Sequence, residues 1–261
     1  MRTLSTTLRW CRCFWVASEP SPTATDDLLS LEGVGAGYGT MQVLWDVSLH
    51  VADGEGVLLL GANGAGKTTL LKAISGLLPL KSGSIQLGGA RIDRLRTDQR
   101  VKLGAGVMTE QGVFPTLSVE DNLLLGAYTL PRAAVAGVMK DVYQLFPELH
   151  ERRHDAVGSL SGGQRKLVAV GKALMCRPQV LVMDEPSAGL SPRYVKEVVA
   201  QLAEVRQRGL SLLIAEQNIA FLELADRVYV LEGGRVRFEG TVSALEGNQE
   251  VREAFFGLGG P

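Results

Sequence analysis

The sequence has one stretch in which glycines, a lysine and a threonine stand at fixed intervals between an apolar run and a helix-period segment. The apolar run is Val57 to Leu60, and the helical pattern extends to Leu78. Between them, the segment from Gly61 to Thr68 is GANGAGKT, which has the spacing G-x-x-x-x-G-K-T. A strand, a glycine-rich turn and a helix in this order predict a phosphate-binding loop within an α/β domain.

The chemistry of phosphate binding explains the residue types in this loop. Its glycines let backbone N–H groups converge on phosphate oxygens, and the helix N-terminus adds a positive dipole. The ammonium group of Lys67 reaches the β- and γ-phosphates, which leaves the hydroxyl of Thr68 to hold Mg²⁺. Alone, the loop predicts an NTPase and nothing finer. The predicted nucleotide-binding residues of the loop are Gly61, Asn63, Gly64, Gly66, Lys67, Thr68 and Thr69.

A second apolar run ends in two adjacent acidic residues. Val180 to Met183 has the pattern of a buried strand, and Asp184 and Glu185 follow it. Two acids in this position also occur as an ordinary helix cap or turn. With a phosphate loop in the same chain, we instead expect Asp184 near Mg²⁺ and Glu185 where it can polarise an attacking water. The pair therefore favours hydrolysis over transfer to a second substrate.

The rest of the chain alternates between strand and helix patterns. Several short apolar runs predict buried strands covered by helices. Helical patterns at Ser118 to Tyr128, which starts with the spacing of a capping box to Asp121, and at Ala133 to Leu145 predict a mostly helical insertion over about 95–160. The pair Gly233-Gly234 predicts a hairpin turn.

Composition excludes several classes of protein. A chain of 261 residues with 46% apolar side chains supports a large buried core, and its net charge of -1 provides no basic surface for nucleic acid. No run approaches the ~20 apolar residues that cross a bilayer, so a membrane role would require a partner. The three cysteines match no zinc or disulfide pattern, which fits a reducing, cytosolic setting.

Residues 1–27 differ from the rest of the chain. They contain three arginines and two tryptophans, with no acidic residue before Glu19. One interpretation is a targeting or membrane-skimming segment, but Arg12 cuts the run Trp10 to Val16 too short for a signal-peptide core. The other is a disordered leader or a misassigned start. We expect a disordered leader over 1–27, the folded domain over 28–257 and a short tail over 258–261.

A serine and a glycine pair precede a third helical pattern. The segment Leu160 to Gln164 is LSGGQ, the helix pattern runs to about Met175, and Pro178 ends it before the acidic strand. Alone, Ser-Gly-Gly-Gln is an ordinary turn that caps a helix, although a hydroxyl and bare N–H groups at a helix start also bind anions. With the phosphate loop before it and the acidic strand after it, the chain resembles the ATPase subunits of ABC transporters, whose signature motif is LSGGQ.

This resemblance extends over nearly all of residues 28–257 and implies an architecture. The fold would be α/β, a P-loop NTPase core with an N-terminal antiparallel β-subdomain and an inserted helical subdomain. Tyr38 would stack on adenine, although a strand aromatic packed in the β-subdomain is the alternative. Ser187 to Pro192 would communicate between subunits. Four residues, Ser161, Gly162, Gly163 and Gln164, would close over the γ-phosphate of ATP held by a second subunit.

Two positions depart from the family pattern. Most members have a glutamine between the core and the helical insertion, where this chain has Thr109, followed by Glu110 and Gln111. Either a neighbour serves through a local shift, or γ-phosphate sensing is weakened. Most members also have a switch histidine where this chain has Gln217. Glutamine can hydrogen-bond the γ-phosphate but cannot carry a proton as histidine does.

The segment Glu216-Gln217-Asn218 is similar to one of the two ATPase subunits of branched-chain amino-acid importers. The segments VFPTLSVEDNL, from Val113 to Leu123, and LADRVYVL, from Leu224 to Leu231, share that similarity. It implies uptake of branched-chain or similar hydrophobic amino acids, with urea or short amides as the alternative. The implied ligands are ATP and Mg²⁺. The implied partners are transmembrane permease subunits, a second ATPase subunit and, indirectly, a substrate-binding protein, at the cytoplasmic face of the inner (plasma) membrane.

Two other classes of function compete with transport. Soluble ABC ATPases act on DNA, ribosomes or cofactor assembly, but the long coiled coil or the fused second copy that many of them carry is not evident here. A regulatory protein that binds nucleotide without turnover would fit Thr109 and Gln217, whereas Glu185 argues against it. We expect a transport ATPase with Lys67, Glu185 and Gln217 as catalytic residues and with Thr68 and Asp184 as metal ligands.

Overall fold

The computed structural model of the protein describes residues 27–109 and 112–248. The leader predicted over 1–27, apart from Asp27, and the tail predicted over 258–261 lie outside the described residues. Glu110 and Gln111, which the sequence singles out at the start of the helical insertion, also lie outside them.

The smaller of two sheets is antiparallel and has the strand order β2-β1-β4-β5. Alternating buried residues of its strands form one face of a core, which is the pattern expected of a half-buried antiparallel sheet. Its strands are β1 (Asp27–Tyr38), β2 (Met41–Ala52), β4 (Leu80–Leu87) and β5 (Ala90–Arg91).

The larger sheet has the order β10-β9-β3-β8-β7-β6, and all its pairs are parallel except β9 with β10. The predicted turn Gly233-Gly234 joins that antiparallel pair. Its central strands are buried throughout and mostly apolar, because both faces are covered. Its strands are β3 (Gly56–Leu60), β6 (Ala105–Met108), β7 (Val180–Asp184), β8 (Ser211–Glu216), β9 (Arg227–Glu232) and β10 (Arg235–Thr241).

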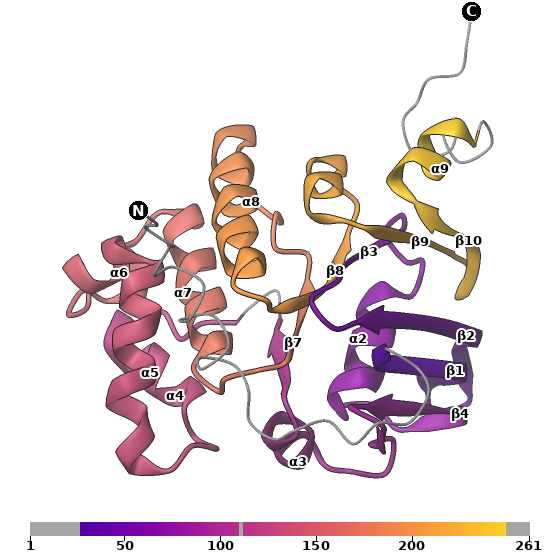
Figure 1. Ribbon diagram of the computed structural model, residues 1–261, viewed down its shortest axis with the longest axis horizontal. Helices are drawn as coiled ribbons and strands as arrows, with labels where there is room; N and C mark the ends of the chain where they lie inside the picture. Colours follow the sequence, from indigo (N-terminus) through magenta and orange to yellow (C-terminus); the bar gives the residue numbers. More distant parts are fainter. Residues whose placement is uncertain (1–26, 110–111, 249–261) are drawn as a thin grey trace, which may run out of the picture.

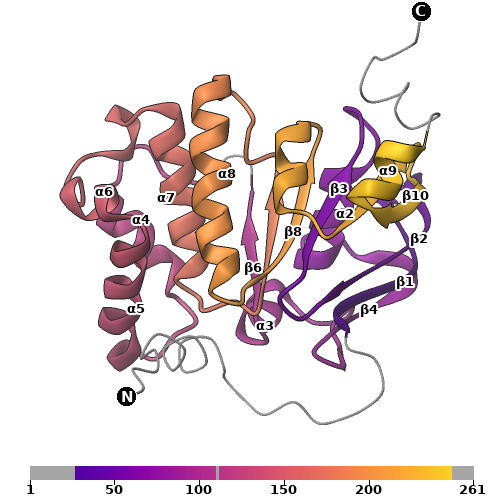
Figure 2. The ribbon, with the colours of Figure 1, turned by 45° about the horizontal axis from the view of Figure 1, so that its top comes forward.

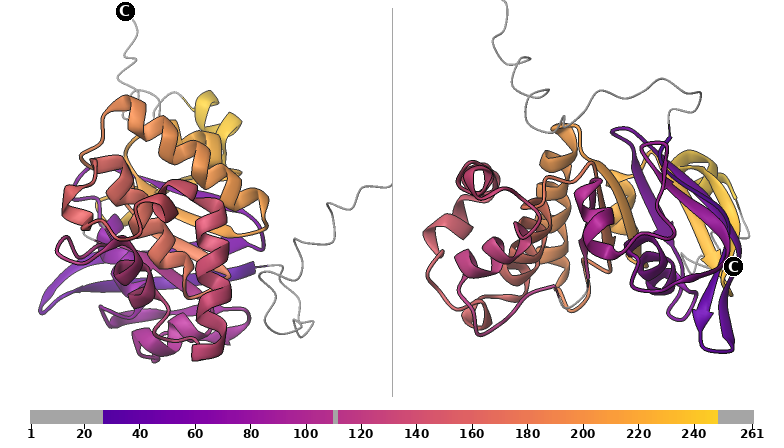
Figure 3. Two further views of the ribbon diagram at one scale, coloured as in Figure 1. Left: turned by 90° about the vertical axis from the view of Figure 1, so that its left-hand side faces the viewer. Right: turned by 90° about the horizontal axis from the view of Figure 1, so that it is seen from below.

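The helices gather on and beside the larger sheet. Figure 1 shows α4, α5 and α6 at one end of the molecule and the antiparallel sheet at the other, and Figure 3 shows the same separation from below. The helices are α2 (Lys67–Ser75), α3 (Thr97–Lys102), α4 (Val119–Gly126), α5 (Arg132–Leu145), α6 (Pro147–Glu151), α7 (Gly162–Leu174), α8 (Pro192–Gln207) and α9 (Val242–Gly247), with 3-10 turns η1 (Val157–Ser159) and η2 (Ile219–Leu224).

Alternation along the central strands divides the interior into two cores. Leu58 and Leu60 of β3 pack in a cluster with α7 and α8, which lie side by side in Figure 2. Val57 and Leu59 point the other way, into a cluster with α2 and the antiparallel sheet. The period of two residues thus decides which helix each side chain of a strand meets. Because α2 and α7 pack on opposite faces, the phosphate loop and the signature segment belong to different layers.

The boundaries of the helical insertion differ from the expected ones. Strand β6 falls inside the range 95–160 but pairs with β7, so the core extends to Met108. Ser118 caps α4 as predicted, with its Oγ accepting from Asp121 N at 3.0 Å. The second bond expected of a capping box is replaced, because the Asp121 carboxylate accepts from the Ser118 hydroxyl instead. Aspartate is one methylene shorter than the glutamate that usually reaches back to the cap.

Across the described ranges, the helices include none that combines the length and the apolar character needed to span a bilayer.

Candidate functional site

The carboxyl ends of β3, β8 and β7 meet at one edge of the larger sheet, because the three strands are adjacent and parallel. The pairing aligns Leu60 with Glu216, and Ala215 with Asp184. At this edge, the phosphate loop follows β3, the acidic pair stands at the end of β7, and Gln217 follows β8. Ligands of open parallel sheets bind at this edge. The fold therefore brings together three segments that are far apart in the sequence.

The phosphate loop is held close to neighbouring backbone. Gly66, which precedes α2, has φ 110, a left-handed conformation that favours glycine. A Cβ at Gly61 would lie only 2.7 Å from Leu231 O. No side chain caps the start of α2, so its first N–H groups form the kind of anion site that helix N-termini provide. Asn63 and Gly64 are exposed on this loop, whereas Thr69 is buried in the first turn of α2.

Lys67 places its ammonium group inside the loop. Its side chain is buried, and Nζ donates to Gly61 O at 2.7 Å and to Ala62 O at 3.2 Å. The same nitrogen lies 3.4 Å from Glu185 Oε1. One buried positive charge therefore stands between the phosphate loop and Glu185, the first residue after β7, where it can meet a phosphate oxygen.

Thr68 and Asp184 also meet across the gap between α2 and β7. The Thr68 hydroxyl donates to Asp184 Oδ1 at 3.2 Å, and Asp184 is buried. Side chains two residues apart in a strand point to the same face, and Val180 and Val182 of β7 pack with α2. The Asp184 side chain therefore also points toward α2. A hydroxyl and one carboxylate suit Mg²⁺, which usually keeps waters and phosphate oxygens as its other ligands. Neither here nor elsewhere among the described residues do three His, Cys, Asp or Glu side chains gather into a group that could hold a metal.

Glu185 adopts an unusual backbone conformation. Its φ of 46 lies in the left-handed region, which is disfavoured for a residue with a Cβ and needs support from its surroundings. The support comes from hydrogen bonds on both sides: Glu185 N donates to Ala215 O at 2.9 Å, and Lys166 Nζ donates to Glu185 O at 3.2 Å. The carboxylate of Glu185 is thereby directed toward the phosphate loop.

Gln217 is exposed just beyond β8. Its backbone N–H donates to Glu216 Oε2 at 2.9 Å. Glu216, to which no sequence pattern assigns a role, is fully buried and also accepts from Ser187 N at 2.7 Å. The sequence does show an acidic residue at the end of an apolar strand, which could have drawn attention to Glu216. Its role also depends on the pairing of β8 with β7, and no local pattern encodes that pairing.

The signature segment begins α7. Ser161 is the N-cap: its Oγ accepts from Gln164 N at 3.3 Å, and Gln164 Oε1 accepts from Ser161 N at 3.1 Å. The structure therefore contains the helix cap that the sequence permits. A Cβ on Gly163 would lie 2.7 Å from Cδ1 of Tyr194, so α8 packs directly against the first turn of α7. A hollow of about 300 Å³ lies between the signature segment and α8.

Tyr38 ends β1 with its ring exposed, at 46% of full accessibility. Lys72, on the helix that follows the phosphate loop, places Nζ 5.7 Å from the ring centroid and 3.5 Å from the hydroxyl. This exposure does not fit an aromatic packed inside the β-subdomain. The ring lies beside α2, where it offers a face for stacking.

The segment between the core and the helical insertion is tied to both. Thr109 is exposed after β6. Lys172 of α7 donates to Gly112 O at 3.1 Å and lies 4.5 Å from the centroid of the Phe114 ring, while burial lowers the pKa of Lys172. Buried Asn122 accepts from Phe114 N at 2.8 Å and donates to Phe114 O at 3.0 Å. These contacts connect Gly112 and Phe114 to α4 and α7.

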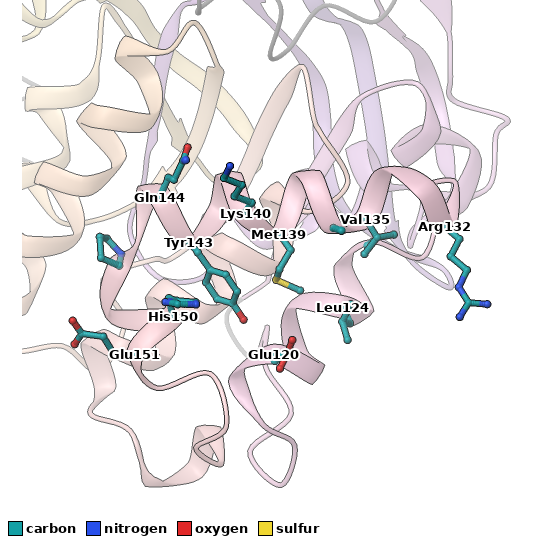
Figure 4. A pocket seen from close by; sticks show the side chains of 13 residues that line it. Glu120, Leu124, Arg132, Val135, Met139, Lys140, Tyr143, Gln144, His150 and Glu151 are labelled. Atoms are coloured by element: carbon teal, nitrogen blue, oxygen red, sulfur yellow. The ribbon is translucent and has the colours of Figure 1, made fainter.

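A groove of about 930 Å³ lies among α4, α5 and α6, as Figure 4 shows. Met139 and Tyr143 project into it from α5 (Figure 4). The Tyr143 hydroxyl is buried and has no hydrogen-bond partner among the described residues. Burial raises the pKa of Tyr143 to about 12. The groove is part of the helical end of the molecule and is separate from the phosphate loop.

Comparisons with known sequences agree on one family. A family model described as ABC transporter matches residues 44–188. The high-affinity branched-chain amino acid transport ATP-binding protein BraG of Pseudomonas aeruginosa is 40% identical over 88% of this chain and 100% of its own length. The probable branched-chain amino acid transport ATP-binding protein LivF of Archaeoglobus fulgidus is 35% identical over 86% and 97%. The lipopolysaccharide export system ATP-binding protein LptB of Escherichia coli K12 is 32% identical over 88% and 97%.

Solved structures give the same result. The ADP conformation of MJ1267, an ATP-binding cassette of an ABC transporter, superposes with a TM-score of 0.79 at 27% identity, covering 89% of this chain and 100% of that one. A nucleotide-free ATP-binding cassette from an ABC transporter superposes with a TM-score of 0.78 at 26% identity. The predicted fold class is thus confirmed.

Proposed function

Because this chain belongs to the ATP-binding subunits of ABC transporters, we propose that it energises the import of branched-chain or similar hydrophobic amino acids. Its enzymatic activity is ATP hydrolysis. The proposed cargo is supported by the names of BraG and LivF, two relatives that align over most of this chain. The proposed location is the cytoplasmic face of the inner membrane, where the subunit would be peripheral.

The observation that carries the proposed mechanism is the convergence of Lys67, Thr68, Asp184 and Glu185 at one edge of the sheet. Lys67 and the N–H groups of the phosphate loop would bind the phosphates, and Tyr38 would stack on adenine. Glu185 would orient and polarise the attacking water, because its carboxylate lies beside Lys67 at the phosphate loop. Gln217 would donate a hydrogen bond to the γ-phosphate.

Thr68 and Asp184 would hold Mg²⁺, which neutralises charge on the phosphates when it is bound. Their oxygens are already within hydrogen-bond distance of each other, so one ion could contact both without a change of fold. Thr68→Ala would keep the carboxylate and lose the hydroxyl ligand.

The signature segment would complete the site of a second subunit. In one chain, α7 packs on the face of the sheet opposite to α2, which supports a role for Ser161, Gly162, Gly163 and Gln164 toward another molecule. We propose that a second copy of the chain is this partner, with a related ATPase subunit as the alternative. Donors at the start of α7 would then stabilise charge on the γ-phosphate.

Exposed apolar side chains support a permease-binding surface at the helical end. Leu124, Leu125 and Tyr128 of the α4 region are all exposed, and Phe114 is exposed on the segment that Asn122 ties to α4. Clusters of this kind commonly mark interfaces. This surface would transmit closure of the ATP site to transmembrane permease subunits, which would in turn receive cargo from a substrate-binding protein.

The cargo is tested by uptake measurements in the native host. Deletion of the gene should reduce uptake of labelled leucine, isoleucine and valine, and the wild-type gene should restore it. Complementation with Lys67→Ala or Glu185→Gln should not. Loss of urea uptake in place of amino-acid uptake would support the urea or amide alternative. Unchanged uptake of both would contradict an import function and favour an export or non-transport role; LptB supplies the precedent for export.

A further inference from the structure

Glu216 ends β8, the strand that lies between the phosphate-loop strand and the acidic strand. It is only 1% exposed. Its Oε1 accepts from Ser187 N at 2.7 Å, and its Oε2 accepts from Gln217 N at 2.9 Å and from Asn218 N at 3.1 Å. A buried carboxylate is costly unless hydrogen bonds compensate for lost water, and three backbone donors supply them here.

The position of Glu216 follows from the period of the strand. Leu212 and Ile214 point into the core that contains α7 and α8, so Glu216 points to the same face. Ala215 points to the opposite face, and its carbonyl accepts from Glu185 N at 2.9 Å. Ala215 and Glu216 therefore hold the segment that follows β7 at two points: Ala215 binds Glu185, and Glu216 binds Ser187.

We propose that Glu216 is a positioning residue that couples the γ-phosphate sensor to the loop facing the second subunit. One of its oxygens fixes the backbone of Gln217, and the other fixes Ser187, where the intersubunit loop begins. A shift of Gln217 on meeting the γ-phosphate is thereby passed to that loop and to Glu185. The proposal rests on the proposed function, since only there do Gln217 and Glu185 act on ATP.

The glutamine at the switch position makes this coupling more important. An uncharged amide acts through a directional hydrogen bond, whose strength falls steeply with poor geometry. Its backbone must therefore be held in place, and the Glu216 carboxylate does so from within the core. Glu216 itself is not a catalytic residue, because backbone donors occupy both of its oxygens.

The test is Glu216→Gln, which keeps the shape of the side chain but turns an NH₂ group toward a backbone N–H. We expect kcat for ATP to fall between about tenfold and a hundredfold, as displaced catalytic groups typically cause. The KM for ATP should stay unchanged, because the phosphate loop is anchored separately. If Glu216→Gln fails to fold, Glu216→Asp is the second variant. Its shorter side chain keeps the charge but cannot reach both Ser187 and Gln217, so kcat should again fall while the KM for ATP stays unchanged.

The matched control is Ser211→Ala at the other end of the same strand. Ser211 is also fully buried, and its Oγ accepts one backbone N–H, from Gly54 at 2.8 Å. This variant should leave kcat unchanged, although it also removes a buried acceptor. If kcat fell as far in Ser211→Ala as in Glu216→Gln, the loss of any buried hydrogen-bond acceptor in β8 would lower kcat by destabilising the fold. That result would overturn the proposal.

A double variant separates positioning from general damage. The double variant Glu216→Gln/Gln217→Ala should have a kcat close to that of whichever single variant has the lower kcat, because both changes disable the same sensor. Effects that multiply would overturn the coupling. Wild type that binds but never hydrolyses ATP would refute the proposed function, whereas active wild type with an unaffected Glu216→Gln variant would refute this inference alone.

Discussion

The residues proposed to hold phosphate and metal were singled out from the sequence because local order marks them. Lys67 and Thr68 follow a strand and start a helix, and Asp184 and Glu185 end a strand. Their partnership across the sheet then follows from parallel strand packing. Glu216 was not predicted, because its role depends on backbone donors from a loop beyond the neighbouring strand. No pattern within its own segment shows that contact.

Gly163 allows a close contact that can be tested at the residue scale. Gly163→Ala should push the first turn of α7 away from Tyr194, because the added methyl would lie 2.7 Å from an aromatic ring carbon. ATP hydrolysis should fall about tenfold or more, since donors at a charged transition state are sensitive to position. ATP binding should persist, because the phosphate loop lies in the other layer.

Two further variants make this result interpretable. Tyr194→Leu added to Gly163→Ala should recover part of the hydrolysis rate by removing the ring. Gly137→Ala in α5, where a Cβ would meet no atom within 4 Å, should leave hydrolysis unchanged and stabilise the fold by about 0.5–1 kcal/mol. Full activity in Gly163→Ala would show that the contact with Tyr194 does not set the position of the signature segment.

At the scale of elements, the β9–β10 turn braces the phosphate loop. Gly234 N donates to Ala65 O at 2.9 Å, and Gly234 O accepts from Trp45 N at 2.8 Å. One turn therefore joins β2 to the loop that precedes α2. The sequence predicted the hairpin from its glycine pair, but the contact with the phosphate loop could not be predicted, because it depends on how the two sheets pack.

This bracing predicts different outcomes for the two glycines of the turn. Both have positive φ, so alanine at either position costs about 1 kcal/mol of strain. A Cβ at Gly234 would also lie 1.7 Å from Val43 O, whereas one at Gly233 would meet nothing within 4 Å. Gly234→Ala should therefore weaken ATP binding and lower the unfolding midpoint in urea, and Gly233→Ala should retain ATP affinity. Equal ATP affinities would show that the turn does not support the loop.

The elements of the helical insertion were predicted in kind but not in extent. Ser118 marked the start of α4, because a helix cap acts locally, and the pattern expected from Ala133 to Leu145 matches α5 to within one residue at its start. Strand β6 was missed inside the insertion, since its four residues are too short a run to show a period. Its identity as a strand comes from pairing with β7, which is a tertiary contact.

At the scale of the whole molecule, the two cores separate nucleotide binding from the signature segment. The α2 layer holds the phosphate loop, and the α7 and α8 layer holds the start of the signature helix. If the signature segment completes an ATP site, as proposed, that site requires a second molecule. An α/β domain with a phosphate loop followed from local patterns in one chain, whereas its full subdomain architecture and the second molecule were implied by family resemblance.

The ATP sandwich between two copies is tested most directly by the mass of Glu185→Gln in solution, measured by light scattering with and without ATP and Mg²⁺. The substitution should block hydrolysis and leave ATP trapped between two chains. The mass should rise from that of one chain to that of two when ATP is added, and it should not rise when Ser161→Arg is present as well. If Glu185→Gln binds ATP yet keeps the mass of one chain, a sandwich between two copies is contradicted.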